Sequence, residues 1–140
     1  MGTEEVRALD GIDLDVPEGD YLAIMGPSGS GKSTLLNLLG CLDRSSGGSH
    51  EVNGIEVTKL SDNELSKVRG ESIGFVFQSY NLIPYLNVLD NIRMPRAYLR
   101  SPKDKLATAK ALAQRIGLGD RLSHRPQELS GGQQQRVGIA

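Results

Sequence analysis

This 140-residue chain has little cysteine, few aromatic residues and almost no net charge. A single cysteine, Cys41, cannot form a disulfide within the chain, which argues against a disulfide-built secreted scaffold. We interpret Cys41 as a small buried apolar residue among the leucines of a helix. The formal net charge of −1 gives no broad basic field, so no nucleic-acid partner is expected.

Long apolar runs are also missing. No stretch approaches the ~20 apolar residues that a membrane-spanning helix needs. The first residues, Met-Gly-Thr-Glu-Glu, have neither the basic region nor the apolar core of a secretory signal. We therefore expect a cytoplasmic protein whose length suits a single domain with a real core.

A glycine-rich loop is the most informative stretch that is present. Residues 26–34 read Gly-Pro-Ser-Gly-Ser-Gly-Lys-Ser-Thr and match the phosphate-binding pattern Gly-x-x-x-x-Gly-Lys-[Ser/Thr]. The apolar run 21–25 before it is typical of a strand buried on both faces, and the leucines after it recur at helical spacing. A strand, a glycine loop and a helix start together form an anion site, which predicts a nucleoside triphosphate ligand.

The residue types in this loop suit that ligand. Glycines at 26, 29 and 31 permit positive φ and a close approach to phosphates. Lys32 would supply a cation for the β- and γ-phosphates, and the Ser33 hydroxyl would ligate Mg²⁺. The alternative is an ordinary turn with Lys32 merely solvated, and the full match in this context argues against it.

The rest of the chain predicts a mixture of strands and helices. Residues 12–16 read as a half-buried strand, and Asn53-Gly54 as the turn of a hairpin between 51–52 and 55–57. Ser61 to Glu64 form a capping box for a helix that ends near Gly70. Helices are also expected over residues 87–98, with Asn87 as cap and Pro95 as a break, and from Ser101-Pro102 to Gly117.

Residues 73–78 predict another strand, which ends in the polar residue Gln78. Ligands of open α/β sheets lie beyond the carboxyl ends of the strands, so Gln78 could reach the phosphates. Taken alone, Gln78 is better interpreted as a solvated strand end. The apolar loop from Tyr80 to Leu86 either folds into its own core or awaits a partner, and the residues leave both alternatives open.

A second helix start carries the decisive motif. Residues 129–133 read Leu-Ser-Gly-Gly-Gln, where Ser130 is a natural N-cap and two glycines expose the first N–H groups, which makes a second anion site. With the glycine loop upstream, this pentapeptide resembles the signature of the ATP-binding subunits of ATP-binding cassette (ABC) transporters. The resemblance covers essentially the whole chain. The predicted strand before Gln78 and the loop after it match that family's Q-loop, so the resemblance favours Gln78 as the Q-loop glutamine over a solvated strand end.

The resemblance implies a role for each motif. ATP and Mg²⁺ would be held by one phosphate loop. Ser33 and Gln78 would ligate the metal ion, and Lys32 and Gln78 would take part in catalysis. In this family two ATPase domains form a head-to-tail dimer, and the signature of one domain covers the ATP bound to the other. Here the signature contacts would come from Ser130, Gly131, Gly132 and Gln133. The phosphate-loop residues are Gly26, Pro27, Ser28, Gly29, Ser30, Gly31, Lys32, Ser33 and Thr34.

The resemblance also implies an α/β fold of the phosphate-loop NTPase type, with an antiparallel β segment and an inserted helical subdomain. Residues 1–86 would form the ATP-binding core, 87–128 the helical subdomain, and 129–140 the signature and the start of its helix. A transmembrane permease would dock on the loop from Tyr80 to Leu86 and the adjoining helices, placing the protein on the inner face of the membrane. Residues 73–78, 81–84 and 89–95 look like the macrolide-export and lipoprotein-releasing branch.

The family's aspartate, catalytic glutamate and switch histidine beyond the signature have no counterpart in these residues. We therefore expect a fragment of an ATPase domain, cut at both ends, that folds poorly and does not hydrolyse ATP alone. Three alternatives are an ABC ATPase of DNA repair or translation, a nucleotide-binding module that never hydrolyses, and a small-molecule kinase. The signature pentapeptide argues strongly against the kinase.

Overall fold

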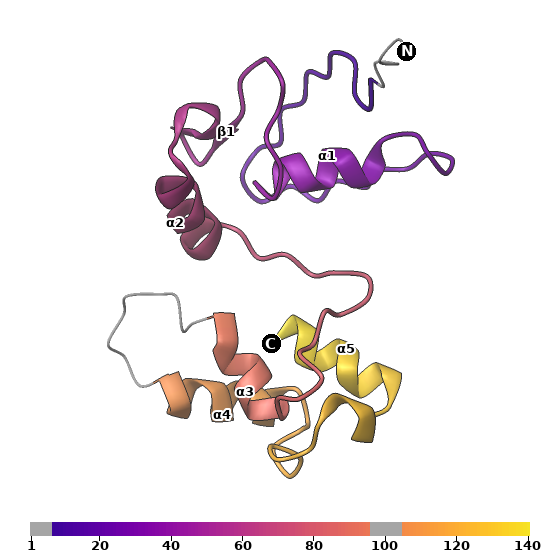
Figure 1. The fold of residues 1–140 in the computed structure, drawn as a ribbon, viewed down its shortest axis with the longest axis vertical. Coiled ribbons are helices and arrows are strands. Elements are labelled where there is room, and N and C mark those ends of the chain that lie inside the picture. Colours follow the sequence, from indigo (N-terminus) through magenta and orange to yellow (C-terminus); the bar gives the residue numbers. More distant parts are fainter. Residues whose placement is uncertain (1–6, 96–104) are drawn as a thin grey trace, which may run out of the picture. The chain divides into compact units, whose positions relative to one another are not determined.

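The computed structural model describes residues 7–95 and 105–140. The chain divides into two compact units, Met1–Ile73 and Gly74–Ala140, and each has a small apolar core of its own. Helices dominate both units (Figure 1). In chain order the elements are α1 (Lys32–Leu39), β1 (Glu51–Val52), β2 (Ile55–Glu56), η1 (Val57–Lys59), α2 (Asp62–Ser72), α3 (Val88–Arg93), α4 (Lys105–Arg115), η3 (Pro126–Glu128) and α5 (Gly131–Ile139).

The hairpin of the first unit forms where the turn residues predict it. β1 and β2 pair antiparallel, with Val52 opposite Ile55. Asn53 and Gly54 both take positive φ, at 50° and 79°, as a two-residue hairpin turn requires. The second strand is shorter than predicted, because Val57 turns inward to open η1 and is buried.

Helix α2 begins at the predicted capping box. The Ser61 side chain accepts from the Glu64 N–H, and the Glu64 carboxylate accepts from the Ser61 N–H at 2.9 Å. The helix buries Leu65 and Val68 against Cys41 and Val57, which together form the core of this unit. The interpretation of Cys41 as a buried apolar residue is confirmed, since it is 1% exposed and burial raises its thiol pKa. Its predicted place within a helix is wrong, because α1 ends at Leu39 with Gly40 as its C-cap, and Cys41 has a left-handed φ of 52°.

The predicted strands at 12–16, 21–25 and 73–78 do not form: these residues have no regular structure, and Gln78 lies in a turn. β1 and β2 form the only sheet found in residues 7–95 and 105–140. Tyr21, interpreted from the sequence as a core residue, is 96% exposed, and Met25 is 88% exposed. The physical reason is that a strand satisfies its backbone only through a neighbour, whereas a helix does so within itself.

In the described part of the second unit, helices α3, α4 and α5 pack together. Side chains of α3, α4 and α5 enclose Val88, Ala109, Ala113 and Val137, and Leu118 beyond α4 is fully buried among them. Asn87 caps α3 as predicted by accepting from the Asp90 N–H at 2.8 Å. Gly117 ends the α4 segment with a φ of 71°, a left-handed conformation that favours glycine.

One predicted helix end differs from the structure, and one predicted helix start cannot be compared with it. The helix expected over residues 87–98 ends at Arg93, because Pro95 lacks the N–H that a continuing helix needs. The predicted cap Ser101-Pro102 lies outside the described residues. The functional division at 86 and 128 stays a prediction.

Helix length bears on membrane insertion. Among the residues that the structure describes, no helix combines the length and the apolar character needed to cross a bilayer.

A carboxylate ties the hairpin to η1 and makes its stability depend on pH. One Glu56 oxygen accepts from the Thr58 hydroxyl at 2.6 Å and from the His50 N–H at 3.1 Å. These hydrogen bonds, the Thr58 hydroxyl first, lower the Glu56 pKa from its ordinary value of 4.5. Because the folded pKa is depressed, the stabilisation is fully present above the unfolded pKa and is lost as pH falls through the folded one.

We therefore expect Glu56→Gln to lower the melting temperature of the full-length protein at pH 7 and to have less effect as the pH falls below 4.5. Differential scanning calorimetry across that range measures the change. The matched control is Glu51→Gln, which removes the carboxylate directly opposite in the hairpin register. Equal effects of the two substitutions at all pH values would contradict the account.

Candidate functional site

The glycine loop adopts the left-handed backbone that its sequence predicts. Gly29 and Gly31 have φ values of 80° and 83°. A tight turn forms within the loop, where the Ser30 N–H donates to the Pro27 carbonyl at 3.3 Å. At Gly26 a Cβ would lie 2.7 Å from the Ser30 hydroxyl oxygen, so the start of the loop lies against Ser30. Residues 25–30 of this curled loop are exposed.

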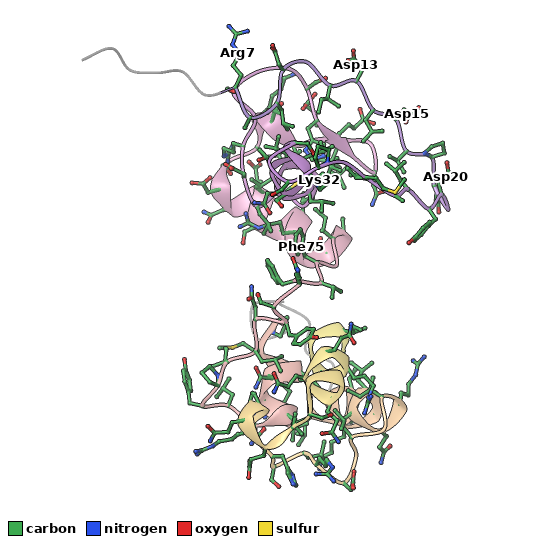
Figure 2. The ribbon with its side chains drawn as sticks, turned by 90° about the vertical axis from the view of Figure 1, so that its right-hand side faces the viewer. Arg7, Asp13, Asp15, Asp20, Lys32 and Phe75 are labelled. Carbon is green, nitrogen blue, oxygen red and sulfur yellow. The ribbon has the colours of Figure 1, made fainter. Side chains whose placement is uncertain are left out.

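Lys32 folds back over this loop from the first position of α1. Its ammonium donates to the Pro27 carbonyl at 2.6 Å and to the Ser30 hydroxyl at 3.2 Å. Figure 2 shows Lys32 at the start of α1, with Asp13, Asp15 and Asp20 along the extended segment that precedes the loop. The charge therefore lies against the curled backbone, where an anion on the loop would meet it.

The helix start adds N–H donors at the same place. The N–H groups of Lys32, Ser33 and Thr34 have no acceptor within α1, and the first intrahelical bond runs from Leu35 to Gly31 at 2.8 Å. Ser33 is exposed. Backbone donors, a helix dipole and a lysine ammonium thus meet at one exposed site, a combination suited to a polyphosphate.

Gly31 is constrained more tightly than Gly29. A Cβ at position 31 would lie 2.7 Å from the Ala8 carbonyl oxygen and 2.8 Å from a Leu9 methyl group, whereas none of the surrounding atoms lies within 4 Å of a Cβ at position 29. The segment around Ala8 therefore packs directly on the start of α1 and holds the loop from behind.

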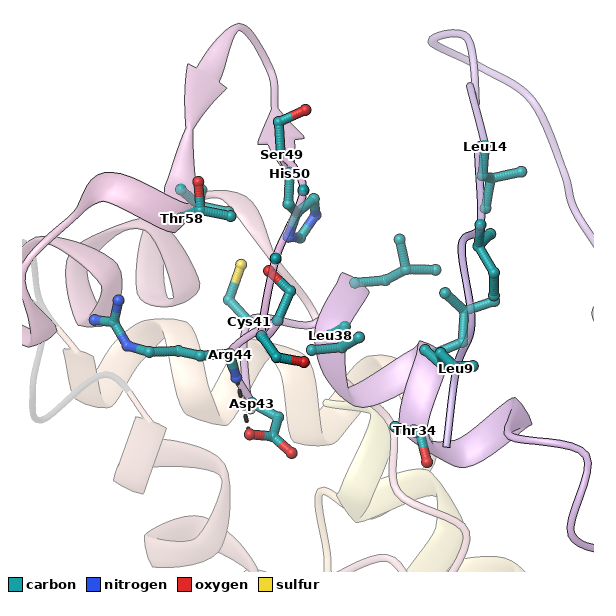
Figure 3. Close-up of a pocket in the computed structure, with 18 of the residues that line it drawn as sticks. Leu9, Leu14, Thr34, Leu38, Cys41, Asp43, Arg44, Ser49, His50 and Thr58 are labelled. Atoms are coloured by element: carbon teal, nitrogen blue, oxygen red, sulfur yellow. Dashed lines mark hydrogen bonds between the residues drawn. The ribbon is translucent and has the colours of Figure 1, made fainter. Parts of the chain in front are cut away.

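An open hollow lies on the other side of α1 in the same unit (Figure 3). Its volume is about 1200 Å³, and its lining includes Leu9 and Leu14 of the segment before the loop and Leu38 of α1. Thr34 is the only residue of the glycine loop that lines it. The hollow is therefore lined by both apolar and polar residues, and neither Lys32 nor Ser33 is among them.

The second predicted site is also a helix start, at α5. Ser130 accepts from the Gln133 N–H at 3.3 Å, and Gln133 accepts from the Ser130 N–H at 2.8 Å. A serine hydroxyl has one donor in addition to its acceptor lone pairs, so the cap leaves the Ser130 O–H available. The amide nitrogen of Gln133 has no acceptor among the described residues.

The two glycines of α5 are not required by the backbone. Neither Gly131 nor Gly132 has a positive φ. A Cβ at Gly131 would have open space around it, and one at Gly132 would lie 4.0 Å from an Arg136 nitrogen. Their N–H groups begin the helix without intrahelical acceptors. Glycine here keeps the helix start bare, which lets a ligand approach from outside the chain.

Gln78 lies in an exposed turn of the second unit. The turn closes where the Tyr80 N–H donates to the Phe77 carbonyl at 3.1 Å, and Tyr80 and Asn81 follow with positive φ values of 59° and 47°. Tyr80 packs on α5, because a Cβ at Gly138 would lie 3.3 Å from the Tyr80 Cβ. The turn that carries Gln78 and the helix that begins at Ser130 are thus connected by a direct contact.

Two polar residues that sequence reasoning missed hold these segments in place. The Asn91 side chain accepts from the Ile83 N–H at 2.8 Å and donates to the carbonyls of Ile83 and Leu86 at 3.2 and 3.0 Å. The Gln134 amide donates to the carbonyls of Pro126 and Leu129. No local pattern marks either residue, since each contact joins segments that only the fold brings together.

The comparisons with known proteins agree on the family. The family model described as ABC transporter matches residues 9–140. The chain belongs to the ABC transporter family. It is 54% identical over 141 residues to an uncharacterised ABC transporter ATP-binding protein of Thermotoga maritima, covering 100% of this chain and 60% of that protein. It is 52% identical to the macrolide export ATP-binding/permease protein MacB of Marinobacter nauticus, covering 99% of this chain and 22% of that protein.

Solved ABC structures share the fold. The ATP-binding cassette MJ0796, solved as a dimer in a post-hydrolysis state with ADP and Pi, matches with a TM-score of 0.82 and 43% identity over 94% of this chain and 59% of that one. The α/β cassette fold and the family inferred from the two motifs are therefore confirmed. The chain spans about three fifths of the length of MJ0796 and of the Thermotoga protein.

The ABC cassette loop should tolerate alanine differently at its two left-handed glycines. Gly29→Ala should cost about 1–2 kcal/mol, the penalty of a left-handed backbone with a Cβ. Gly31→Ala should cost clearly more, because its Cβ would also meet the Ala8 carbonyl at 2.7 Å. Urea unfolding of the full-length protein measures both. Equal losses would show that the Ala8 segment does not pack on α1.

Proposed function

We propose that this chain is an ATP-binding part of an ABC transporter, which binds ATP with Mg²⁺ on residues 26–34 and closes over the ATP of a second copy with residues 130–133. The observation that carries the proposal is the Lys32 ammonium held 2.6 Å from the Pro27 carbonyl, above the left-handed loop at the start of α1. That arrangement offers a cation and several N–H donors to one polyphosphate.

The residues of this loop fit a magnesium ion. Mg²⁺ prefers hard oxygen ligands and is usually bound by one or two protein groups together with substrate phosphates and waters. Ser33 offers an exposed hydroxyl oxygen. Gln78, in the other unit, is proposed as a second ligand only from the resemblance to the family's Q-loop. Among the described residues there is no cluster of three or more carboxylate, histidine or cysteine side chains, so the phosphates would supply most of the binding. When bound, the ion would offset phosphate charge.

In this proposal, ATP hydrolysis is an activity of the whole transporter protein. Attack of water on the γ-phosphate is helped by groups that orient the water and stabilise the developing charge. Lys32 would stabilise charge, and Gln78 would orient the water. Sequence reasoning assigns a general base to none of the 140 residues, so the activity proposed for this chain alone is binding.

The second helix start supports the dimer. The Ser130 hydroxyl oxygen caps α5 as an acceptor, which leaves its O–H free to donate. Gly131 and Gly132 present uncovered N–H groups, and the Gln133 amide nitrogen is also free to donate. All are donors, so they suit the γ-phosphate of an ATP bound to another copy. MJ0796 was solved as a dimer, which is in keeping with this arrangement.

ATP affinity tests the first site. Lys32→Ala in the full-length protein should weaken ATP binding roughly tenfold or more, because a charge-assisted contact to the phosphates is lost. Isothermal titration with Mg·ATP measures the change. Lys59→Ala, at the exposed end of η1, is the control for removing a lysine charge and should bind as the wild type does. Unchanged affinity of Lys32→Ala would refute the site.

ATP-driven association tests the second site. Ser130→Ala should bind Mg·ATP normally but dimerise poorly with it, as measured by light scattering on a background that does not turn over ATP. Ser61→Ala is the matched control, since it removes a capping box of the same kind from α2 at a similar cost of about 1 kcal/mol. If both variants dimerise equally, residue 130 serves only as a cap.

The loop from Tyr80 to Leu86 is the proposed docking site for a membrane permease. Tyr85 is 72% exposed at the tip of a turn closed by the Leu86 N–H and the Ile83 carbonyl at 3.1 Å. Asn91 holds the same turn from α3. An exposed tyrosine on a fixed turn suits a protein contact, and several relatives are named as ATP-binding/permease proteins. Macrolide export or lipoprotein release is the transport proposed, with the chain on the inner face of the membrane.

Loss of the turn should uncouple the permease from the ATPase. Asn91→Ala removes the hydrogen bonds that fix residues 83–86 and should cost about 1–3 kcal/mol of local stability. We expect it to reduce permease stimulation of ATPase activity while Mg·ATP affinity stays unchanged, measured on the full transporter in vesicles. Asn63→Ala, at an exposed position of α2, is the control. Full stimulation of Asn91→Ala would exclude this loop.

A further inference from the structure

The peptide group that joins Leu129 to Ser130 is held along both edges by side chains of α5. Its carbonyl accepts from the Gln134 amide nitrogen at 3.1 Å, and its N–H donates to the Gln133 amide oxygen at 2.8 Å. A peptide group is planar, so these two bonds together fix how it is rotated. That rotation sets the direction in which the chain enters the helix at Ser130.

The Gln134 contact anchors this peptide to the body of the unit. The same amide nitrogen also donates to the Pro126 carbonyl at 2.9 Å, and that carbonyl accepts from the Leu129 N–H at 3.0 Å. Pro126 is buried, and Leu129 is 7% exposed in the core that includes Val137. Gln134 thus connects the helix start to a segment that cannot move freely.

Only a donor can play this part at position 134. Both partners of the side chain are carbonyl oxygens, so the amide must turn its NH₂ toward them and its own oxygen away. Methionine has a similar length and helix propensity but no N–H, whereas lysine keeps a donor on a flexible stem. A partly buried carbonyl that loses its donor is costly, so the structure distinguishes these substitutions sharply.

We propose that Gln134 is a positioning residue for the signature: it fixes the Leu129–Ser130 peptide so that the Ser130 hydroxyl and the glycine N–H groups are already aimed at the partner's ATP. The inference rests on the proposed function, because Ser130 and Gly131 matter here as donors to a second copy. Gln134 itself touches carbonyls of its own chain and acts only through the residues before it. A preset helix start lowers the entropy lost when the dimer closes.

Amide exchange on the full-length protein tests the first half of the proposal without nucleotide. We expect the Ser130 N–H to exchange roughly tenfold faster in Gln134→Met than in the wild type, and at the wild-type rate in Gln134→Lys. The Leu118 N–H, which donates to the Ala113 carbonyl at 2.8 Å in the buried core, reports whether the unit stays folded and should not change. Equal Ser130 exchange in the wild type and Gln134→Met would overturn the proposal.

ATP-driven association tests the second half. Gln134→Met should associate roughly tenfold more weakly in Mg·ATP, with unchanged ATP affinity of the single subunit, and Gln134→Lys should restore association. Gln114→Met on the exposed face of α4 controls for the chemical change. Should Gln134→Met fail to fold, Gln134→Lys decides alone: poor association of a folded lysine variant overturns the donor argument, and full association supports it.

The failures of the two proposals can be told apart. If the wild type itself does not associate with Mg·ATP, the proposed function fails, and the exchange rates still decide whether Gln134 holds this peptide. If the wild type associates and Gln134→Met associates equally well, the positioning role is wrong and the proposed function is untouched. Loss in both the methionine and the lysine variant would assign a general structural role to this side chain and overturn the positioning one.

Discussion

The first N–H groups of an α-helix have no acceptor in the helix, and both stretches that we propose as phosphate sites are built on that constraint. At α1 the donors are left open by a curled glycine loop, with Lys32 folded against it. At α5 the side chains of Ser130 and Gln133 each accept from the other residue's N–H. Gly131 and Gly132 leave the remaining N–H donors uncovered by side chains. One chain thus has two helix starts with open N–H donors, and we propose both as anion sites.

The second unit depends on side chains that bind backbone carbonyls at a distance. The Asn91 amide donates to the Ile83 and Leu86 carbonyls, and the Gln134 amide donates to the Leu129 carbonyl just before Ser130. Arg136 donates to the Ile116 carbonyl at 2.9 Å, just beyond the end of α4. Each of these contacts satisfies a carbonyl that no regular element pairs. Together these side-chain contacts fix the loops that join the short helices. The loops therefore keep a defined shape around a small core.

The sequence predicted the local elements of this fold well. The Asn53-Gly54 turn, the capping box at Ser61 and the caps at Asn87 and Ser130 all lie where their residues indicated. The extended segments 12–16, 21–25 and 73–78 are apolar as strands should be, yet the described residues offer them no partner. Strand pairing joins distant parts of a chain, so an apolar pattern predicts the tendency and leaves the pairing open.

By itself the sequence determined the family, the two helix starts and the identity of the residues at them, because caps, glycine turns and phosphate loops are set by residues within a few positions of one another. Tertiary structure alone decided what holds those starts in place. Gln134 reaches Pro126 across eight positions, Asn91 reaches Ile83 across eight, and Arg69 reaches the Cys41 carbonyl across 28. Such contacts exist only after the core has brought the segments together, and no local pattern encodes them.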